Sequence, residues 1–172
     1  HHKGSAFGTI GENTQPETEF FENQLFEKLL QLDPSRPVWL EDESRTIGKV
    51  HIPETFYSKM RSSLVYKVEL NKHFRVKRLV SEYAKAPPHQ LKRSIQAIRK
   101  RLGGVRTQLA LDSVDSGDYY NAADIALSYY DKAYNYGLSK RDPELILPVR
   151  FAKDHPQENA LKVISLAYKK AF

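Results

Sequence analysis

The feature that most constrains this fold is a long central segment, residues 72–142, in which helix patterns follow one another almost without strand signals. Apolar residues recur there at the spacing of amphipathic helices, and glycines separate the runs. The pattern predicts a helical subdomain over residues 72–142, with helices at residues 74–83, 88–102, 105–114 and 118–136.

Strand patterns occur only on either side of this segment. Residues 37–40 form a short apolar run that ends in acids, which predicts a buried strand, and residues 64–70 alternate as a second strand. Residues 145–149 predict a third strand, at a sheet edge because Pro148 cannot donate a ladder hydrogen bond.

The flanking segments also carry helix patterns. Thr14 and Glu17 have capping-box spacing, which predicts a helix start, and Asp33-Pro34 ends that helix. Its apolar face is expected to pack in the core; it consists of Phe21, Leu25, Leu29 and Leu32. Two further helices are predicted over residues 53–61 and 158–168, and Asn71 is expected to cap the first central helix.

Strands separated by helices predict an α/β fold with a parallel sheet, formed by residues 1–71 and 143–172. Three strands are fewer than the roughly five or six strands of a typical sheet. No glycine-rich phosphate-loop motif of the Walker or dinucleotide type occurs in the chain. Either the domain is of another type, or its first strand and helix lie outside this sequence.

The basic charge is concentrated in one part of the central segment. The chain has a net charge of +6, with 27 Lys and Arg residues and 21 Asp and Glu residues. Residues 72–106 hold eleven of the cations and a single acid, Glu82, a balance of +10, whereas the remainder has 16 cations and 20 acids, a balance of −4. This concentration indicates a polyanionic partner.

Within that segment a cationic helix face lies beside an apolar one. The apolar residues are Leu91, Ile95, Ile98 and Leu102. The cations predicted to contact RNA phosphates are Lys92, Arg93, Arg99, Lys100 and Arg101. A solvated helix face is the alternative. Nearby tyrosines have the chemistry to stack on bases, with core packing as their alternative role.

Two further segments are candidates for phosphate binding. Glu41, Asp42 and Glu43 follow the predicted strand at residues 37–40, where nucleotide-binding sheets place metal-orienting carboxylates. Turn acids, or an ion pair with Arg45, are the alternatives. The opening loop, with Gly4 and Ser5, would let backbone N–H groups approach an anion, unless its His pair and Gly-Ser are a purification tag.

Several classes of chemistry and location are excluded or disfavoured. The chain has no Cys, which excludes disulfides, thiolate metal sites and thiol nucleophiles. We predict no metal site and no catalytic residue for chemistry at sulfur or selenium. No apolar run approaches the ~18 residues of a membrane span, and no signal peptide is apparent, so a cytoplasmic protein without membrane partners is expected.

Three strings in the chain resemble the tRNA 2-selenouridine synthase family: HHKGSAFG at the start, WLEDESRTIGKVHIP at Trp39 to Pro53, and YYDKAY at Tyr129 to Tyr134. The resemblance implies a partial P-loop-type sheet with a mainly helical, basic subdomain that binds tRNA. It also implies a rhodanese-like domain with a catalytic Cys, and a Walker A loop, both upstream of this sequence. The isolated chain is then expected to be inactive.

The activity implied by the resemblance is replacement of sulfur by selenium at the wobble 2-thiouridine of tRNA. Selenophosphate is the implied selenium donor, and geranyl diphosphate the source of a geranyl-thiouridine intermediate; a need for Mg²⁺ is left open. The implied phosphate-binding residues are Gly4, Ser5, Glu41, Asp42, Glu43, Arg45, Arg61 and Arg75. Two alternatives remain, a nucleotide-kinase-like P-loop enzyme fragment and a non-catalytic helical RNA-binding module.

Overall fold

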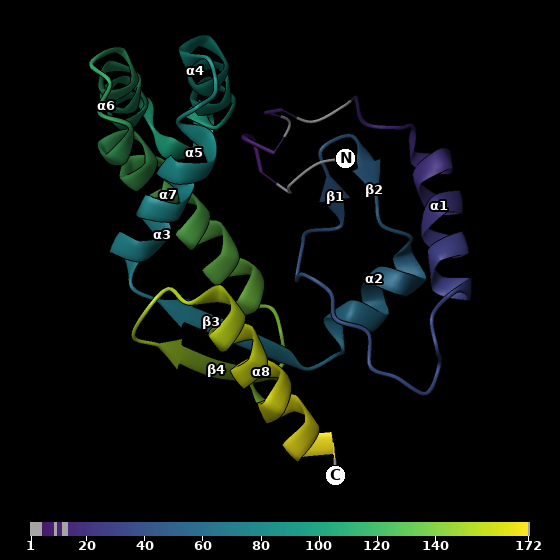
Figure 1. Cartoon of the computed structure of the whole chain (residues 1–172). Helices are drawn as coiled ribbons and strands as arrows, with labels where there is room; N and C mark the ends of the chain where they lie inside the picture. The colour runs from purple at the N-terminus through teal and green to yellow at the C-terminus, as the bar shows by residue number, and fades with distance from the viewer. Residues whose placement is uncertain (1–4, 9, 12–13, 172) are drawn as a thin grey trace.

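The computed structural model describes residues 5–8, 10–11 and 14–171 and has an α/β architecture (Figure 1). A group of helices lies at one end of the molecule and a small parallel sheet at the other. The long helix α7, Tyr119–Leu138, runs from the helical group toward the sheet. The predicted fold class is therefore confirmed.

The parallel sheet consists of β3, Val65–Leu70, and β4, Ile146–Phe151, with Val65 opposite Ile146 and Leu70 opposite Phe151. Both strands were predicted within one or two residues. Pro148 lies inside β4, opposite Lys67. The short 3-10 turn Pro143–Leu145 leads into β4, and α8, Pro156–Ala171, follows it.

The strand predicted at residues 37–40 is wrong. The segment forms no strand, and Val38, Trp39 and Leu40 are 49%, 47% and 53% exposed. Nothing in the described part of the chain hydrogen-bonds to its backbone. Composition alone favoured a strand here, but a strand exists only when a second strand satisfies its N–H and C=O groups.

A small antiparallel hairpin that sequence reasoning did not predict follows the acidic residues. It pairs β1, Thr46–Ile47, with β2, Val50–His51. Gly48 turns the chain at a φ of 61°, a conformation that side chains disfavour. Val50 and Ile52, at and after β2, are buried.

The helix predicted near Thr14 begins later than expected. α1 spans Thr18–Leu30, and its N-cap is Glu17, whose side chain makes no capping hydrogen bond. The capping-box prediction is therefore wrong, and none of the residues of α1 is fully buried. By contrast, α2, Glu54–Arg61, follows Pro53 as predicted.

The helical group contains α3, Lys72–Tyr83, α4, Pro88–Ala97, α5, Arg99–Leu102, and α6, Gly104–Asp115, together with α7. Asn71 caps α3 as predicted, because its Oδ1 accepts from the N–H of His73 at 2.9 Å. The helix predicted over residues 88–102 is interrupted at Ile98, which leaves α4 and α5 as separate helices.

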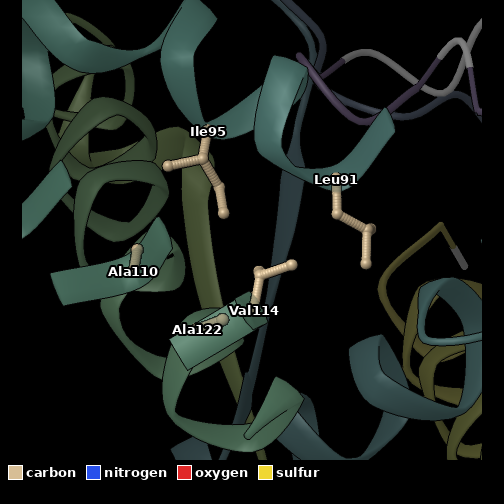
Figure 2. Close-up of a cluster of buried hydrophobic side chains, with 5 residues drawn as sticks. All are labelled: Leu91, Ile95, Ala110, Val114 and Ala122. Atoms are coloured by element: carbon tan, nitrogen blue, oxygen red, sulfur yellow. The ribbon is translucent and has the colours of Figure 1, made fainter. Parts of the chain in front are cut away.

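The core of the helical group lies where α4 and α6 meet the start of α7 (Figure 2). Ile95 is 1% exposed and Ala110 is fully buried. Phe7 of the opening loop packs against the same cluster. The apolar residues of this core are Leu91, Ile95, Ala110, Val114 and Ala122. The division into residues 72–142 and a flanking α/β part stays a prediction.

None of the helices in the described ranges is both long enough and apolar enough to span a membrane.

Candidate functional site

The acidic segment Glu41–Glu43 lies along an open pocket of about 1420 Å³. Residues 37–40 and the start of β3 form its apolar walls, and Ser35 and Arg36 also line it. Tyr134 of α7, Arg141 and the end of α8 complete the lining. No group of three or more His, Asp or Glu side chains suited to a metal ion occurs in the ranges that the structure describes.

Asp42 is held by two guanidinium groups. Arg141 Nε lies 3.1 Å from one carboxylate oxygen, and Arg141 Nη2 also donates to the carboxylate. Arg61 Nη1 lies 3.4 Å from both oxygens, and its Nη2 donates to the carbonyl of Gly137 at 2.8 Å. The Arg141 side chain is only 2% exposed. This cluster ties the acidic segment to α2 and to the end of α7.

Sequence reasoning missed Arg141. It follows α7 in a turn, and a single Arg after a helix carries no pattern that indicates burial. Its Nη1 donates to three carbonyl oxygens, at 2.6 Å for Arg61 and 3.2 Å for Met60 and for Ser63. The guanidinium therefore satisfies the carbonyl end of α2 as well as Asp42.

Glu43 and Tyr134 form a second contact at the pocket. The Tyr134 hydroxyl donates to Glu43 Oε1 at 3.1 Å. Burial raises the pKa of Glu43, while this hydrogen bond lowers it, and the net direction is upward. Burial and then the charge of Glu43 raise the pKa of Tyr134. Glu43 is thus a half-buried carboxyl group with a higher proton affinity than usual.

The opening loop meets α7 one helical turn from this contact. The backbone N–H of Ala6 donates to the Tyr130 hydroxyl at 3.0 Å, and the Ser5 hydroxyl accepts from the N–H of Phe7 at 3.1 Å. Tyr130 and Tyr134 are four residues apart and share one face of α7. Ser5 and Glu43 are thereby brought to the same side of the helix. Gly4 lies outside the described residues.

Arg45 and Arg75 point to other partners. Arg45 Nη1 lies 2.5 Å from Glu54 Oε2, and both side chains are more than half exposed. Arg75 of α3 pairs with Asp131 of α7. The structure thus does not gather all the predicted phosphate-binding residues into one pocket, and their role in binding stays a prediction.

Eight of the eleven cations of residues 72–106 fall into two groups of four. Four of them pair with acids elsewhere in the fold: Lys72 with Asp124, Arg75 with Asp131, Arg78 with Asp154, and Lys92 with Asp115. Within the described ranges, no acid pairs with four of the predicted RNA-contacting cations, and all four are exposed: Arg93, Arg99, Lys100 and Arg101. We call these four residues the cationic face.

The apolar side of the same helices is buried, as predicted. Leu91, Ile95, Ile98 and Leu102 are each no more than 7% exposed. Arg101 Nη1 donates to the Tyr129 hydroxyl at 3.0 Å. Tyr129 in turn packs against Tyr130, with ring centroids 4.9 Å apart. Tyr129 is thus half-buried, with its hydroxyl directed at the cationic face.

The chain matches a family model described as the tRNA 2-selenouridine synthase AAA domain over residues 1–156. The chain belongs to the tRNA 2-selenouridine synthase family. The match includes the acidic segment, Tyr130 and Tyr134 of α7, Arg141 and the cationic face.

Curated relatives carry the same name. The tRNA 2-selenouridine synthase of Shewanella loihica is 33% identical over 90% of this chain and 49% of its own length. That of Nitrosomonas eutropha is 30% identical over 81% of this chain and 48% of its own length. The chain thus spans about half the length of these family members. No solved structure matches the chain.

Proposed function

We propose that this chain supplies the tRNA-binding surface of a tRNA 2-selenouridine synthase. The observation that carries the proposal is the cationic face on α4 and α5, whose four exposed cations have no acid partner in the described ranges. Exposed cations without an acid partner are available to phosphates, whereas Lys72 or Lys92 would first have to leave an acid.

The proposed whole-protein reaction replaces sulfur by selenium at the wobble 2-thiouridine of tRNA. Selenophosphate would donate selenium, and geranyl diphosphate would form a geranyl-thiouridine intermediate. This chain has no Cys, so the thiol of that reaction would belong to a rhodanese-like domain elsewhere in the protein. The contribution of this chain is then to bind and position the tRNA.

Reversal of three neighbouring charges tests the tRNA surface. In the variant Arg99→Glu, Lys100→Glu and Arg101→Glu, we expect tRNA affinity to fall by roughly 100-fold and the slope of log K against log salt to decrease by about 2 to 3. The control, Lys28→Glu, Lys59→Glu and Lys153→Glu, changes the net charge equally at exposed sites outside the basic segment. Equal losses in both variants would show that only net charge matters.

We further propose that the donor diphosphate binds at the acidic end of the pocket, between Glu43 and the Ser5 loop. Both segments contact α7, through Tyr134 and through Tyr130. Carboxylates there would hold a diphosphate through a divalent cation rather than directly. Arg45 and Arg61 already have acid partners, so each would have to share its guanidinium with the donor.

Calorimetry on the complete gene product tests this donor site. Geranyl diphosphate is expected to bind more tightly with Mg²⁺ than without it, and the variant Glu43→Gln is expected to weaken binding. Tighter binding of ATP-Mg²⁺ than of geranyl diphosphate would instead favour a nucleotide-kinase-like enzyme. If Glu43→Gln and Arg45→Ala both modify tRNA at the normal rate, these two residues have only a structural role. That result would favour a non-catalytic RNA-binding module.

A further inference from the structure

The apolar part of the pocket contains a segment with the composition of a buried strand but without the backbone pairing of one. Val38, Trp39 and Leu40 follow one another in a stretch without regular secondary structure and are each about half exposed. Their N–H and C=O groups form no hydrogen bond within the described part of the chain. An apolar segment of this kind is normally buried and paired, so its exposure indicates a missing partner.

A second unpaired backbone lies across the same pocket. In the described ranges β3 pairs only with β4, so one edge of β3 has no neighbour. Leu64, Val65 and Tyr66 line the pocket, whereas no residue of β4 does, which places the pocket on the free-edge side of β3. Parallel sheets are normally larger and covered on both faces, and free edges recruit further strands.

The size and lining of the pocket favour a polypeptide over a small molecule. Its volume of about 1420 Å³ exceeds the ~300–1,000 Å³ of typical small-molecule sites. Away from Glu41 to Glu43 the walls are mainly apolar. Trp39 stacks at a tilt on Tyr66, with ring centroids 5.5 Å apart, and so links the two unpaired segments at one end.

We propose that this pocket docks an apolar β-strand from the part of the full-length protein that this chain does not span. The strand pairs with the free edge of β3 and packs against Val38 and Leu40. Curated relatives are about twice as long as the region they share with this chain, which leaves ample polypeptide to supply it. A strand satisfies exposed backbone groups and apolar side chains together, whereas a helix satisfies only the side chains. Docking of this strand does not require tRNA.

Hydrogen exchange read by mass spectrometry tests the docking directly. Peptides covering residues 37–43 and 64–70 are compared between this 172-residue chain and the complete gene product. We expect their amides to exchange on the order of 100-fold more slowly in the complete product. Equal exchange in the two proteins would overturn the proposal. Protection that appears in the isolated chain as its concentration rises would also overturn it, because a second copy would then be the occupant.

A charge variant keeps the test specific to the proposed strand. In the complete product, Val38→Asp with Leu40→Asp is expected to return the 64–70 peptide to the fast exchange of the isolated chain. The matched control, Val105→Asp with Leu109→Asp, changes two apolar side chains of α6 that are also exposed, 78% and 52%, and is expected to leave that peptide protected. Slow exchange of α4 and α6 in both variants shows that the helical core is intact. Continued protection of 64–70 in the Val38 and Leu40 variant would contradict docking at this site.

Discussion

The guanidinium of Arg141 binds the carboxylate of Asp42 across 99 residues of sequence, with Nε 3.1 Å from Oδ2. Arg141 is almost fully buried, whereas the Asp42 side chain is 23% exposed. The acid also contacts Arg61, so one carboxylate is shared by two guanidinium groups. This relationship fixes the acidic segment against α2 and the end of α7, and gives Asp42 a structural role in addition to any role in binding.

Removing Asp42 is expected to destabilise the fold strongly. The variant Asp42→Ala leaves the buried Arg141 without its counter-charge, a change that costs about 3–5 kcal/mol in the free energy of unfolding. Urea unfolding followed by circular dichroism measures this loss. The control Asp33→Ala breaks the exposed pair with Arg36 and is expected to change stability by less than about 0.5 kcal/mol. Similar losses of unfolding free energy in both variants would show that the contact with buried Arg141 contributes no more than an exposed ion pair.

The stability of the protein is expected to depend on pH through Glu43. Its pKa in the folded state lies above the ordinary value of 4.5, chiefly because of burial. The folded state therefore holds the proton more tightly than the unfolded state does. The resulting stabilisation is complete below pH 4.5 and is lost as the pH rises through the folded-state pKa.

Comparison with Glu43→Gln isolates this contribution. Gln keeps an acceptor for the Tyr134 hydroxyl but does not titrate. Urea unfolding between about pH 4 and pH 7 should show the variant gaining stability relative to the parent protein as the pH rises. Parallel curves for the two proteins would mean that Glu43 titrates alike in the folded and unfolded states.

Elements whose stability is local could be read from the sequence. The helices of the central segment and the strands at 65–70 and 146–151 lie close to their predicted positions, because periodicity and glycine breaks encode them directly. The strand predicted at residues 37–40 failed because strand formation depends on a partner that the pattern does not contain. The hairpin at Gly48 is too short to show a period.

The candidate site could be predicted only in part. The cationic face was visible because acids are nearly absent from residues 72–106. Sequence could not show which of those cations pair with distant acids, such as Lys92 with Asp115. Nor could it show that Arg141 is buried, since that depends on a turn after α7 meeting α2 and Asp42.

The Asn71 cap is expected to contribute measurably to stability. Asn71→Ala removes the acceptor for the N–H of His73, and loss of such a cap typically costs about 1 kcal/mol. Glu17→Ala is the matched control, because Glu17 occupies the same position before α1 without making a capping hydrogen bond. In urea unfolding, the midpoint denaturant concentration should fall for Asn71→Ala and stay unchanged for Glu17→Ala. A comparable shift for Glu17→Ala would mean that the loss in Asn71→Ala cannot be assigned to its capping hydrogen bond.

Truncation of Ile95 is expected to be among the most damaging changes in the helical group. Its side chain is 1% exposed and packs between α4 and α6 beside Val114. Ile95→Ala should lower the free energy of unfolding by about 2–5 kcal/mol, because it combines lost burial with a cavity. Leu109→Ala, on the exposed side of α6, should cost less than about 0.5 kcal/mol.

Because α4 also carries Arg93, tRNA binding by Ile95→Ala should weaken only at temperatures or urea concentrations where circular dichroism shows the helices melting. A loss of tRNA affinity while the helices remain folded would show that the core also sets the position of the cations.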